Sequence, residues 1–159
     1  MDVTFKDIDA EQHYLTCYEF RKDSYFCSFG TLEGYEQSVI GYQDKITTRM
    51  GSPEWFYIHI WHHDRIVGQL EFKTLSFKPD YGYVHLVYVV PDYRGAGVSP
   101  LILPYIEAQL RARGCQGAIL LVSRSNERAL NYYRKCGWRF LSKNPKHELT
   151  DFYECTFSG

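Results

Sequence analysis

The sequence predicts one α/β domain over residues 1–159, built on a mixed central sheet with flanking helices in the order α-α-β-β-β-α-β-α-β-β. Its length and its 45% content of hydrophobic residues are sufficient for one buried core. In the first half, apolar and polar residues alternate on both sides of a short polar turn, which is typical of a β-hairpin. In the second half, two helix-like segments flank a short apolar run, which indicates crossover connections to that strand.

The N-terminal third is predicted to contain two helices joined by a loop. Residues 10–20 space their aromatic and aliphatic side chains roughly as a helix does, and residues 35–49 have a second apolar side. The segment between them, RKDSYFCSFG at 21–30, ends in glycine. We therefore expect this segment to be a loop with buried aromatic rings.

Three strands are predicted next. EWFYIHIWHHDRIVGQLEFKT, residues 54–74, alternates around the polar cluster at 62–65 and predicts a strand, a turn and a strand. YGYVHLVYVV, residues 81–90, is rich in β-branched and aromatic residues, as strands are. On an ideal strand, the odd-numbered residues from Tyr83 to Val89 share one face.

The second half alternates helices and strands. Residues 98–113 carry helix-spaced apolar side chains, and the predicted helix stops at Gly114. The run AILLV at 118–122 suits a strand that is covered on both faces. Ser125 or Asn126 is expected to cap a further helix. WRFLS and DFYECTF then close the chain as two strands.

The segment VPDYRGAGVSP, residues 90–100, joins the third strand to a helix. A helix N-terminus has unpaired N–H groups and a partial positive charge, so it binds anions. Gly95 and Gly97 let a ligand approach the backbone, and Arg94 adds a full positive charge. A pyrophosphate would fit, and a plain turn is the alternative. The segment is neither a GxGxxG loop nor a Walker A loop.

A second segment, NERALNYYRKCGWRF at 126–140, also contains a motif, and it follows the glycine loop in the sequence. Together they resemble the GNAT superfamily, the acetyl-CoA-dependent N-acetyltransferases. The family signature Q/R-x-x-G-x-G/A is matched from Arg94 to Ser99, with serine in the last position. The signature N-x-x-A-x-x-x-Y-x-x-x-G-F/W is matched from Asn126 to Trp138. The resemblance covers roughly residues 55–157 and implies a GNAT-like mixed sheet.

The resemblance also implies acetyl-CoA as cosubstrate, and no metal. Backbone groups of the third strand would pair with the pantetheine arm and stabilise the oxyanion, and the sheet would splay after Val87 around a bulge. The implied cofactor-binding residues are Val87, Tyr88, Val89, Arg94, Gly95, Ala96, Gly97, Val98, Ser99, Asn126 and Tyr133. Pro100 fits the first turn of the following helix, whereas Pro104 should kink that helix or shift its start.

The family match implies that Tyr133 donates a proton to the leaving thiolate of coenzyme A. The adjacent Tyr132 is the competitor, because neighbouring helical residues point about 100° apart. For the base, His85 occupies a position at which serotonin N-acetyltransferase-like members carry a histidine, although it is equally a candidate core residue. Glu71 on the neighbouring strand and a water relay are the alternatives.

These residues imply transfer of an acetyl group from acetyl-CoA to a primary amine of a small molecule or peptide, by direct attack in a ternary complex. A catalytically silent GNAT-like module that binds acyl-CoA or a protein partner is the second hypothesis, and a nucleotide-binding protein is the third. The aromatic N-terminal third, with Asp23, Glu33 and Glu36, would suit a cationic amine, or its rings form core. Small amines, aminoglycosides, amino acids and protein N-termini all stay open as acceptors.

The amino-acid composition limits the classes of partner that the protein is expected to bind. Eighteen Lys and Arg residues against 19 Asp and Glu residues give a net charge of −1, without the basic excess of a nucleic-acid-binding protein. No apolar run reaches a membrane span, and MDVTFKDIDAEQ is not a signal peptide. Five cysteines without a CxxC pair predict buried free thiols, and His62 and His63 predict a turn rather than a metal site. We expect a cytoplasmic protein without nucleic-acid or membrane partners, and a homodimer stays open.

Overall fold

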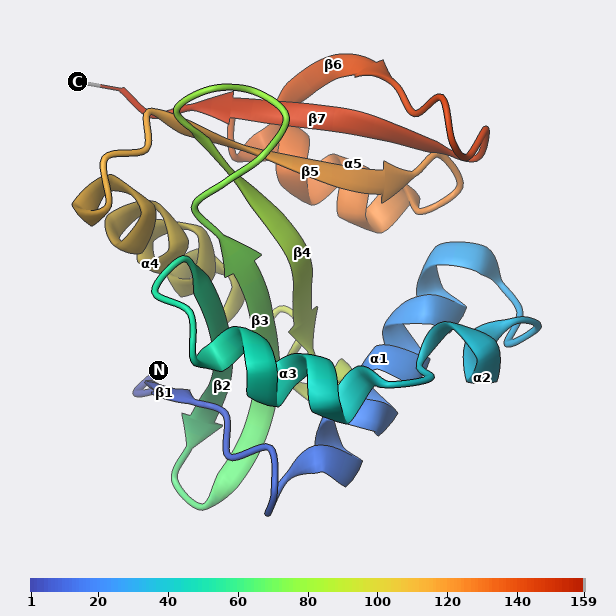
Figure 1. Cartoon of the computed structure of the whole chain (residues 1–159), viewed down its shortest axis with the longest axis vertical. Coiled ribbons are helices and arrows are strands. Elements are labelled where there is room, and N and C mark those ends of the chain that lie inside the picture. The colour runs from blue at the N-terminus through green and yellow to red at the C-terminus, as the bar shows by residue number, and fades with distance from the viewer. Residues whose placement is uncertain (159) are drawn as a thin grey trace.

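The computed structural model describes residues 1–158 and contains one seven-stranded sheet in the order β1-β2-β3-β4-β5-β7-β6 (Figure 1). The strands are β1 Thr4–Asp7, β2 Trp55–His62, β3 Arg65–Lys73, β4 Tyr81–Val89, β5 Gly117–Ser123, β6 Arg139–Lys143 and β7 Thr150–Thr156. The helices are α1 Tyr14–Phe29, α2 Tyr35–Ser38, α3 Tyr42–Met50, α4 Ser99–Ala112 and α5 Glu127–Lys135, with a 3-10 turn at Pro91–Tyr93. β4 and β5 run parallel and the other neighbouring strands run antiparallel. The predicted mixed α/β sheet is confirmed.

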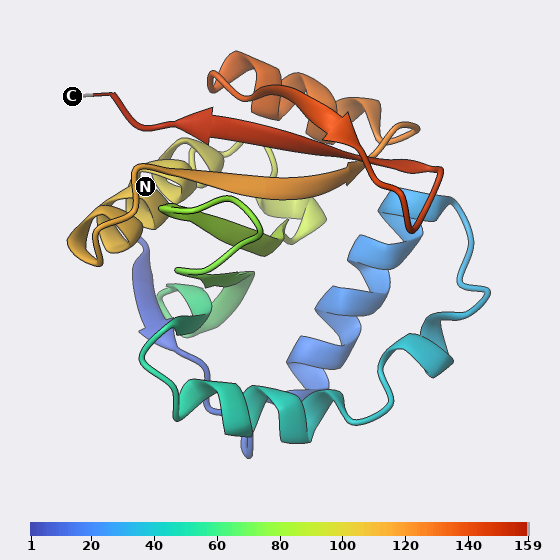
Figure 2. The ribbon, with the colours of Figure 1, turned by 45° about the horizontal axis from the view of Figure 1, so that its top comes forward.

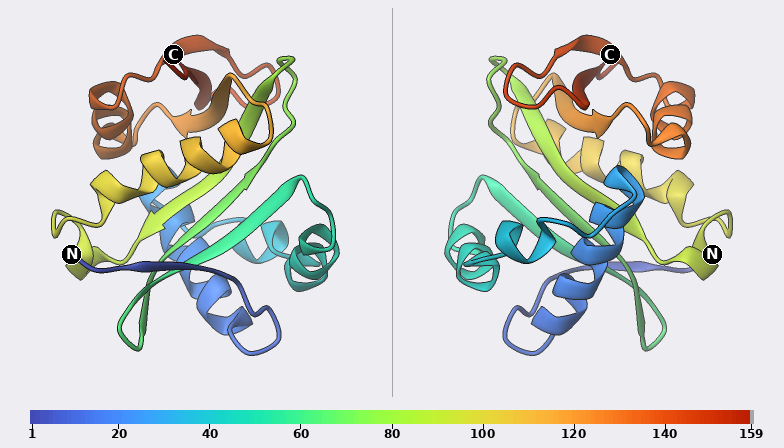
Figure 3. Two further views of the ribbon diagram at one scale, coloured as in Figure 1. Left: turned by 90° about the vertical axis from the view of Figure 1, so that its left-hand side faces the viewer. Right: turned by 90° about the vertical axis from the view of Figure 1, so that its right-hand side faces the viewer.

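Helices cover both faces of the sheet. The main core lies under α4 and α5, where Ile102, Ile106 and Leu110 pack against the strands. A smaller cluster on the opposite face joins α1 and α3 to β2 through Cys17, Ile46 and neighbouring residues. Figure 3 shows α4 and α5 on one side of the sheet and α2 and α3 on the other. Within residues 1–158, no helix has the length and apolar character needed to cross a membrane.

The N-terminal third differs most from the prediction. Residues 21–30 are not a loop, because α1 continues to Phe29 and ends at Gly30, whose φ of 71° is left-handed. Neither glycine nor proline interrupts the segment before that point. The predicted helix at 35–49 is divided into α2 and α3, and Gly41, with φ of 77°, precedes α3. β1 was not predicted, because its four residues, TFKD, contain a single apolar side chain and so give no alternating pattern.

The central and C-terminal elements follow the prediction closely. The turn at His63 and Asp64 joins β2 and β3, and Asn126 caps α5 by accepting a hydrogen bond from the Ala129 N–H (3.3 Å). The expected shift of the helix start at Pro104 is wrong, because α4 begins at Ser99 and continues through Pro104. All five cysteines are unpaired, but only Cys17 and Cys115 among them are buried.

β4 carries a β-bulge at His85. Phe72 of β3 pairs with Val84, and the preceding residue of β3, Glu71, pairs with Leu86. His85 is therefore an extra residue on β4, opposite no residue of β3. Such an insertion bends the strand and shifts the alternation of faces beyond it.

The bulge makes the prediction of one shared face for the odd-numbered residues wrong. The rings of Tyr83 and His85 contact each other in a tilted arrangement with centroids 4.5 Å apart, and His85 also contacts Trp55, which packs against the α1–α3 cluster. Val87 instead pairs with Leu70, which belongs to the core under α4. The bulge therefore aims His85 toward α1 and α3 while Val87 lies on the opposite face.

The sheet splits between its two parallel strands. β4 and β5 pair from Tyr81 and Gly117 as far as Val84 and Leu120, and beyond that point each strand follows its other neighbour. Figure 1 shows the two strands diverging. The separation begins at the bulge, three residues before the predicted position at Val87. The edge of β4 that faces β5 is consequently unpaired from His85 onward.

Candidate active site

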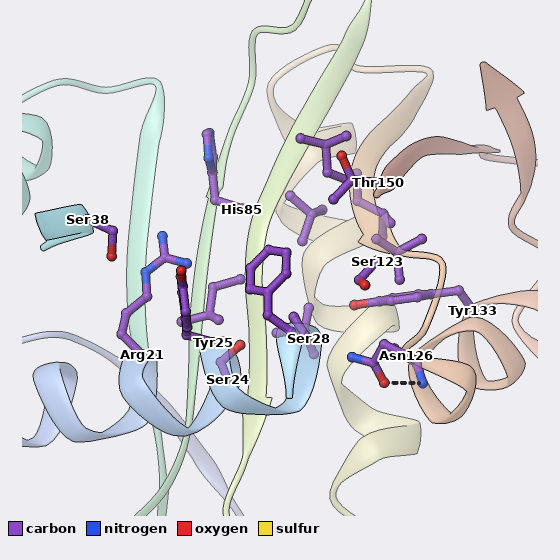
Figure 4. A pocket seen from close by; sticks show the side chains of 18 of the residues that line it. Arg21, Ser24, Tyr25, Ser28, Ser38, His85, Ser123, Asn126, Tyr133 and Thr150 are labelled. Carbon is purple, nitrogen blue, oxygen red and sulfur yellow. Dashed lines mark hydrogen bonds between the residues drawn. The ribbon is translucent and has the colours of Figure 1, made fainter. Parts of the chain in front are cut away.

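A pocket of about 430 Å³ lies where β4 and β5 separate (Figure 4). Its walls come from α1, α2, β4, β5, α5 and the start of β7. Figure 2 shows the C-terminal end of α1 reaching the C-terminal end of β5, where the Ser125 hydroxyl donates to the Ser28 carbonyl at 3.2 Å. The pocket therefore passes through the split and opens toward the helices on both faces.

One wall is the C-terminal half of α1. Arg21, Ser24, Tyr25, Ser28 and Phe29 line the pocket at positions i, i+3, i+4, i+7 and i+8 of that helix. Sequence reasoning missed these residues because it assigned the segment to a loop. Their helical spacing is a signal that could have identified them, since residues so spaced share one face.

The β4 wall includes the predicted residues His85 and Val87. The Nε2 atom of His85 is buried and has no hydrogen-bond partner within residues 1–158. Burial, followed by nearby cations with Lys73 first among them, lowers the pKa of His85 to about 3. His85 is therefore a neutral imidazole at physiological pH, with an unsatisfied polar atom at the pocket wall.

The α5 wall consists of Asn126, Ala129 and Tyr133, which share one face of the helix. Tyr133 extends from α5 into the pocket (Figure 4). Burial, and then the neighbouring Tyr132, raises the pKa of Tyr133, so that its hydroxyl stays protonated at neutral pH. Tyr132 lies outside this pocket and donates to the Ser99 carbonyl at 2.9 Å. Tyr133 is thus the tyrosine that faces the pocket.

Glu71 does not line the pocket and is 1% exposed. Its carboxylate accepts hydrogen bonds from Arg21 Nη2 at 3.0 Å, from Gln69 Nε2 at 2.8 Å and from the Tyr42 hydroxyl. The network continues behind it, because Gln69 Oε1 lies 2.8 Å from His59 Nε2. The carboxylate is therefore fully engaged in a buried polar network behind the pocket wall.

The glycine loop lies between the end of β4 and the start of α4. Gly95 and Gly97 have φ values of 78° and 95°, which side chains rarely adopt. A Cβ added at Gly95 would meet no atom within 4 Å. In the first turn of α4, Pro100 has no N–H and the Leu101 N–H donates to the Val98 carbonyl at 2.9 Å, so the first-turn donor nearest the loop is the N–H of Ser99. The loop thus offers an open backbone surface with donors.

The Arg94 side chain turns back toward β4. Its Nε donates to the Val89 carbonyl at 2.9 Å and its Nη2 lies 3.3 Å from Asp23 Oδ2. The Tyr88 hydroxyl donates to the same Asp23 oxygen at 2.5 Å. Arg94 and Tyr88 therefore connect the end of β4 to α1, and neither residue lines the pocket.

The pocket brings together four of the predicted residues, namely His85, Val87, Asn126 and Tyr133. The remaining predicted residues do not line it: Glu71, Tyr88, Val89, Arg94, Gly95, Ala96, Gly97, Val98 and Ser99. Most of the latter continue β4 beyond the split or form the glycine loop. His62 Nδ1 lies 2.8 Å from the Tyr93 hydroxyl, and no group of three potential metal-ligating side chains occurs within residues 1–158.

The residues present suit an elongated ligand with amides and an anionic end. The unpaired edge of β4 offers backbone N–H and C=O groups in a row, as an added strand requires. The open glycine loop and the first turn of α4 follow directly along the chain. These two features fit the pantetheine arm and pyrophosphate of coenzyme A.

Comparison with known proteins gives a consistent result. A model of the acetyltransferase (GNAT) family matches residues 13–138. Acetyltransferase SG1711 of Sodalis glossinidius (strain morsitans) is 35% identical over 54 residues, which are 34% of this chain and 38% of that protein. The chain thus spans well under half the length of that curated relative.

Solved structures share the fold at low sequence identity. PaiA N-acetyltransferase of Thermoplasma acidophilum, in complex with coenzyme A, has a TM-score of 0.81 at 16% identity, covering 99% of this chain and 100% of that one. An acetyltransferase of Thermus thermophilus has a TM-score of 0.78 at 18% identity, covering 99% and 98%. Spermidine N-acetyltransferase of Vibrio cholerae, in complex with coenzyme A and spermine, has a TM-score of 0.68 at 11% identity, covering 96% and 92%.

Proposed function

Because the chain belongs to the acetyltransferase (GNAT) family, we propose that it transfers an acetyl group from acetyl-CoA to a primary amine of a small molecule or peptide, by direct attack in a ternary complex. The main support is the pocket where β4 and β5 separate. Val87 on the unpaired edge of β4 and the protonated Tyr133 hydroxyl line the same space. An acyl-transfer site needs this combination of backbone donors and a proton donor.

Backbone groups hold the cosubstrate in this proposal. Val87, Tyr88 and Val89 pair with the amides of the pantetheine arm, because their edge of β4 has no β5 partner. The N–H groups of Gly95, Gly97, Val98 and Ser99 bind the pyrophosphate, whereas the Ala96 N–H donates to the Tyr93 carbonyl at 3.2 Å. Arg94 fastens the start of the loop to the Val89 carbonyl and adds positive charge nearby.

The Tyr133 hydroxyl, which its raised pKa keeps protonated at neutral pH, donates its proton to the thiolate as the C–S bond breaks, and the proton that the attacking nitrogen loses as the C–N bond forms restores that hydroxyl. Backbone N–H groups of β4 stabilise the oxyanion. Neutral His85 is a weak base against an alkylammonium with a pKa near ~10. We therefore assign His85 the role of accepting a hydrogen bond from the neutral amine or from a relaying water. Glu71 holds Arg21 and does not exchange protons with the amine.

The test compares two tyrosine variants in an assay of free thiol release over a panel of amines. Tyr133→Phe should lower kcat by about 10²- to 10⁴-fold, which is the usual contribution of a general acid. Tyr132→Phe is the matched control, because it removes a hydroxyl that bonds to Ser99 outside the pocket. Its kcat should stay near that of the wild type.

Two results would contradict the proposal. Equal kcat values for the wild type and Tyr133→Phe would remove Tyr133 from the reaction. Tight binding of acetyl-CoA in calorimetry, with no thiol released by any amine, would favour the catalytically silent module instead.

A further inference from the structure

We propose that the acceptor is a small amine that also carries a carboxylate, as an amino acid does, and that Arg21 binds this carboxylate. The inference rests on the proposed function and names the acceptor class for the same pocket. It depends on three observations: the charges of the pocket lining, the fixed position of Arg21 and the cations that surround His85.

The pocket lining contains a cation and no carboxylate. Within residues 1–158, Arg21 lines the pocket, whereas no Asp or Glu does. Asp23 accepts from the Tyr88 hydroxyl and pairs with Arg94, and Glu36 accepts from the Tyr18 hydroxyl. Two of the three acidic residues expected to attract a cationic amine are therefore engaged by other side chains, and the third, Glu33, does not line the pocket.

Arg21 has more hydrogen-bond donors than its contact with Glu71 uses. Its guanidinium carries five N–H donors, and Nη2 is bonded to Glu71 Oε1 at 3.0 Å. The side chain is 32% exposed and points into the pocket (Figure 4). A carboxylate is the group that a guanidinium binds best, through two parallel hydrogen bonds.

Glu71 fixes Arg21 without competing at the pocket surface. The Tyr42 hydroxyl and Gln69 Nε2 occupy Glu71 Oε2, and Arg21 occupies Oε1. The carboxylate is 1% exposed, so a ligand in the pocket meets the guanidinium and not the anion behind it. A donor group held in this way loses little conformational entropy when a ligand binds.

The surroundings of His85 are cationic. After burial, four cations lower its pKa: Lys73, Arg21, Arg49 and Lys45, in that order. The Lys73 ammonium lies 5.0 Å from the Trp55 ring centroid, and the Arg49 guanidinium lies 4.0 Å from the same centroid. These charges repel a polyamine, whereas they attract an anionic group and favour the neutral form of the amine that attacks.

The experiment compares amines that differ only by a carboxylate. Tyrosine is paired with tyramine and phenylalanine with phenethylamine, and spermidine is added as a polycation. Thiol release is measured for each acceptor with acetyl-CoA. We expect kcat/KM to favour the carboxylate-bearing member of each pair by about 10- to 100-fold, as a charge-assisted bidentate contact does.

Arg21→Lys keeps a positive charge beside Glu71 but removes the two-pronged donor. It should reduce the preference for the carboxylate-bearing acceptor at least fivefold, because KM should rise more for the amino acids than for tyramine. Arg49→Lys is the matched control, because Arg49 belongs to the same cationic group but bonds to the Tyr57 hydroxyl and does not line the pocket. Thermal unfolding of both variants verifies that they are folded.

The outcomes separate this inference from the proposed function. Faster turnover of tyramine or spermidine than of the amino acids would overturn the inference and leave the acetyltransferase standing. An unchanged preference in a folded Arg21→Lys protein would overturn the role of Arg21. If no amine released thiol, the binding of tyrosine and of tyramine to the CoA-loaded protein would be measured by calorimetry. Tyrosine that bound no more tightly than tyramine, or did not bind, would refute the carboxylate site.

Discussion

Replacing Glu71 by glutamine distinguishes the two roles that this residue can have. The sequence allowed Glu71 to be the catalytic base, whereas the structure surrounds its carboxylate with Arg21, Gln69 and Tyr42. Glu71→Gln keeps the shape of the side chain and removes its charge. If Glu71 holds Arg21, this change should lower stability and spare the chemical step.

The magnitude follows from the burial of the pair. Breaking a buried ion pair by removing one charge costs about 3–5 kcal/mol. Because the Arg21 side chain is 32% exposed, water replaces part of the lost interaction, and we take the lower end, about 3 kcal/mol. For a chain of this size, 1 kcal/mol shifts Tm by about 2–4 °C, so Tm should fall by about 6–12 °C.

Activity is measured with tyramine, well below the lowered Tm. Tyramine has no carboxylate for Arg21 to bind, so kcat with tyramine should stay within about threefold of the wild-type value. Glu154→Gln is the matched control, because Glu154 is 5% exposed and its carboxylate pairs with Lys78 at 2.6 Å and Arg139 at 3.4 Å, away from the pocket. It should also lower Tm and spare kcat.

A base would behave differently. Loss of a general base lowers kcat by about 10²- to 10⁴-fold and alters the pH–rate profile for every acceptor. An unchanged Tm together with such a loss of kcat in Glu71→Gln, but not in Glu154→Gln, would refute the reasoning.

Two further predictions concern the glycine loop and acid stability. Gly97→Ala and Gly114→Ala each place a side chain at a left-handed φ, 95° and 89° respectively. Each variant should therefore lose about 1–2 kcal/mol of stability, as measured by thermal unfolding. Only Gly97→Ala should also weaken the binding of coenzyme A, as measured by calorimetry. Burial lowers the pKa of His59 to about 4, so below pH 6.5 the unfolded chain binds a proton that the folded chain does not. His59 should therefore account for roughly 2 kcal/mol of the stability lost between pH 7 and pH 5, and His85, whose pKa is lowered to about 3, for a similar amount; the loss should be smaller by the His59 share in His59→Asn.

The local conformation of the segments that we propose bind the cosubstrate could be predicted because its signals are local. Gly95 and Gly97 adopt left-handed φ values that favour glycine, and Asn126 caps the helix that carries Tyr133. Each residue acts through neighbours a few positions away, so its spacing in the sequence already contains the geometry. The choice of Tyr133 over Tyr132 also agrees with the structure, since Tyr133 lines the pocket.

The position of the sheet split could not be predicted in the same way. An ideal strand assigns His85 and Val87 to one face, and only the pairing with β3 reveals the extra residue at His85. Bulges depend on the register of the partner strand, which no single segment encodes. The early separation after Val84 depends likewise on where β5 turns toward β7.

The acceptor side depends on contacts between distant parts of the chain. Arg21 and Glu71 are 50 residues apart, and Tyr42 reaches the same carboxylate from a third element. Considered alone, Glu71 on a strand beside the predicted site suits a base, and the acids of the N-terminal third suit a cationic acceptor. In our proposal the network reverses both interpretations, because the Glu71 carboxylate holds a cation at the pocket surface. On this view the family signature indicates the acetyl donor, whereas the preference for an acceptor depends on which charged side chains the fold leaves facing the pocket.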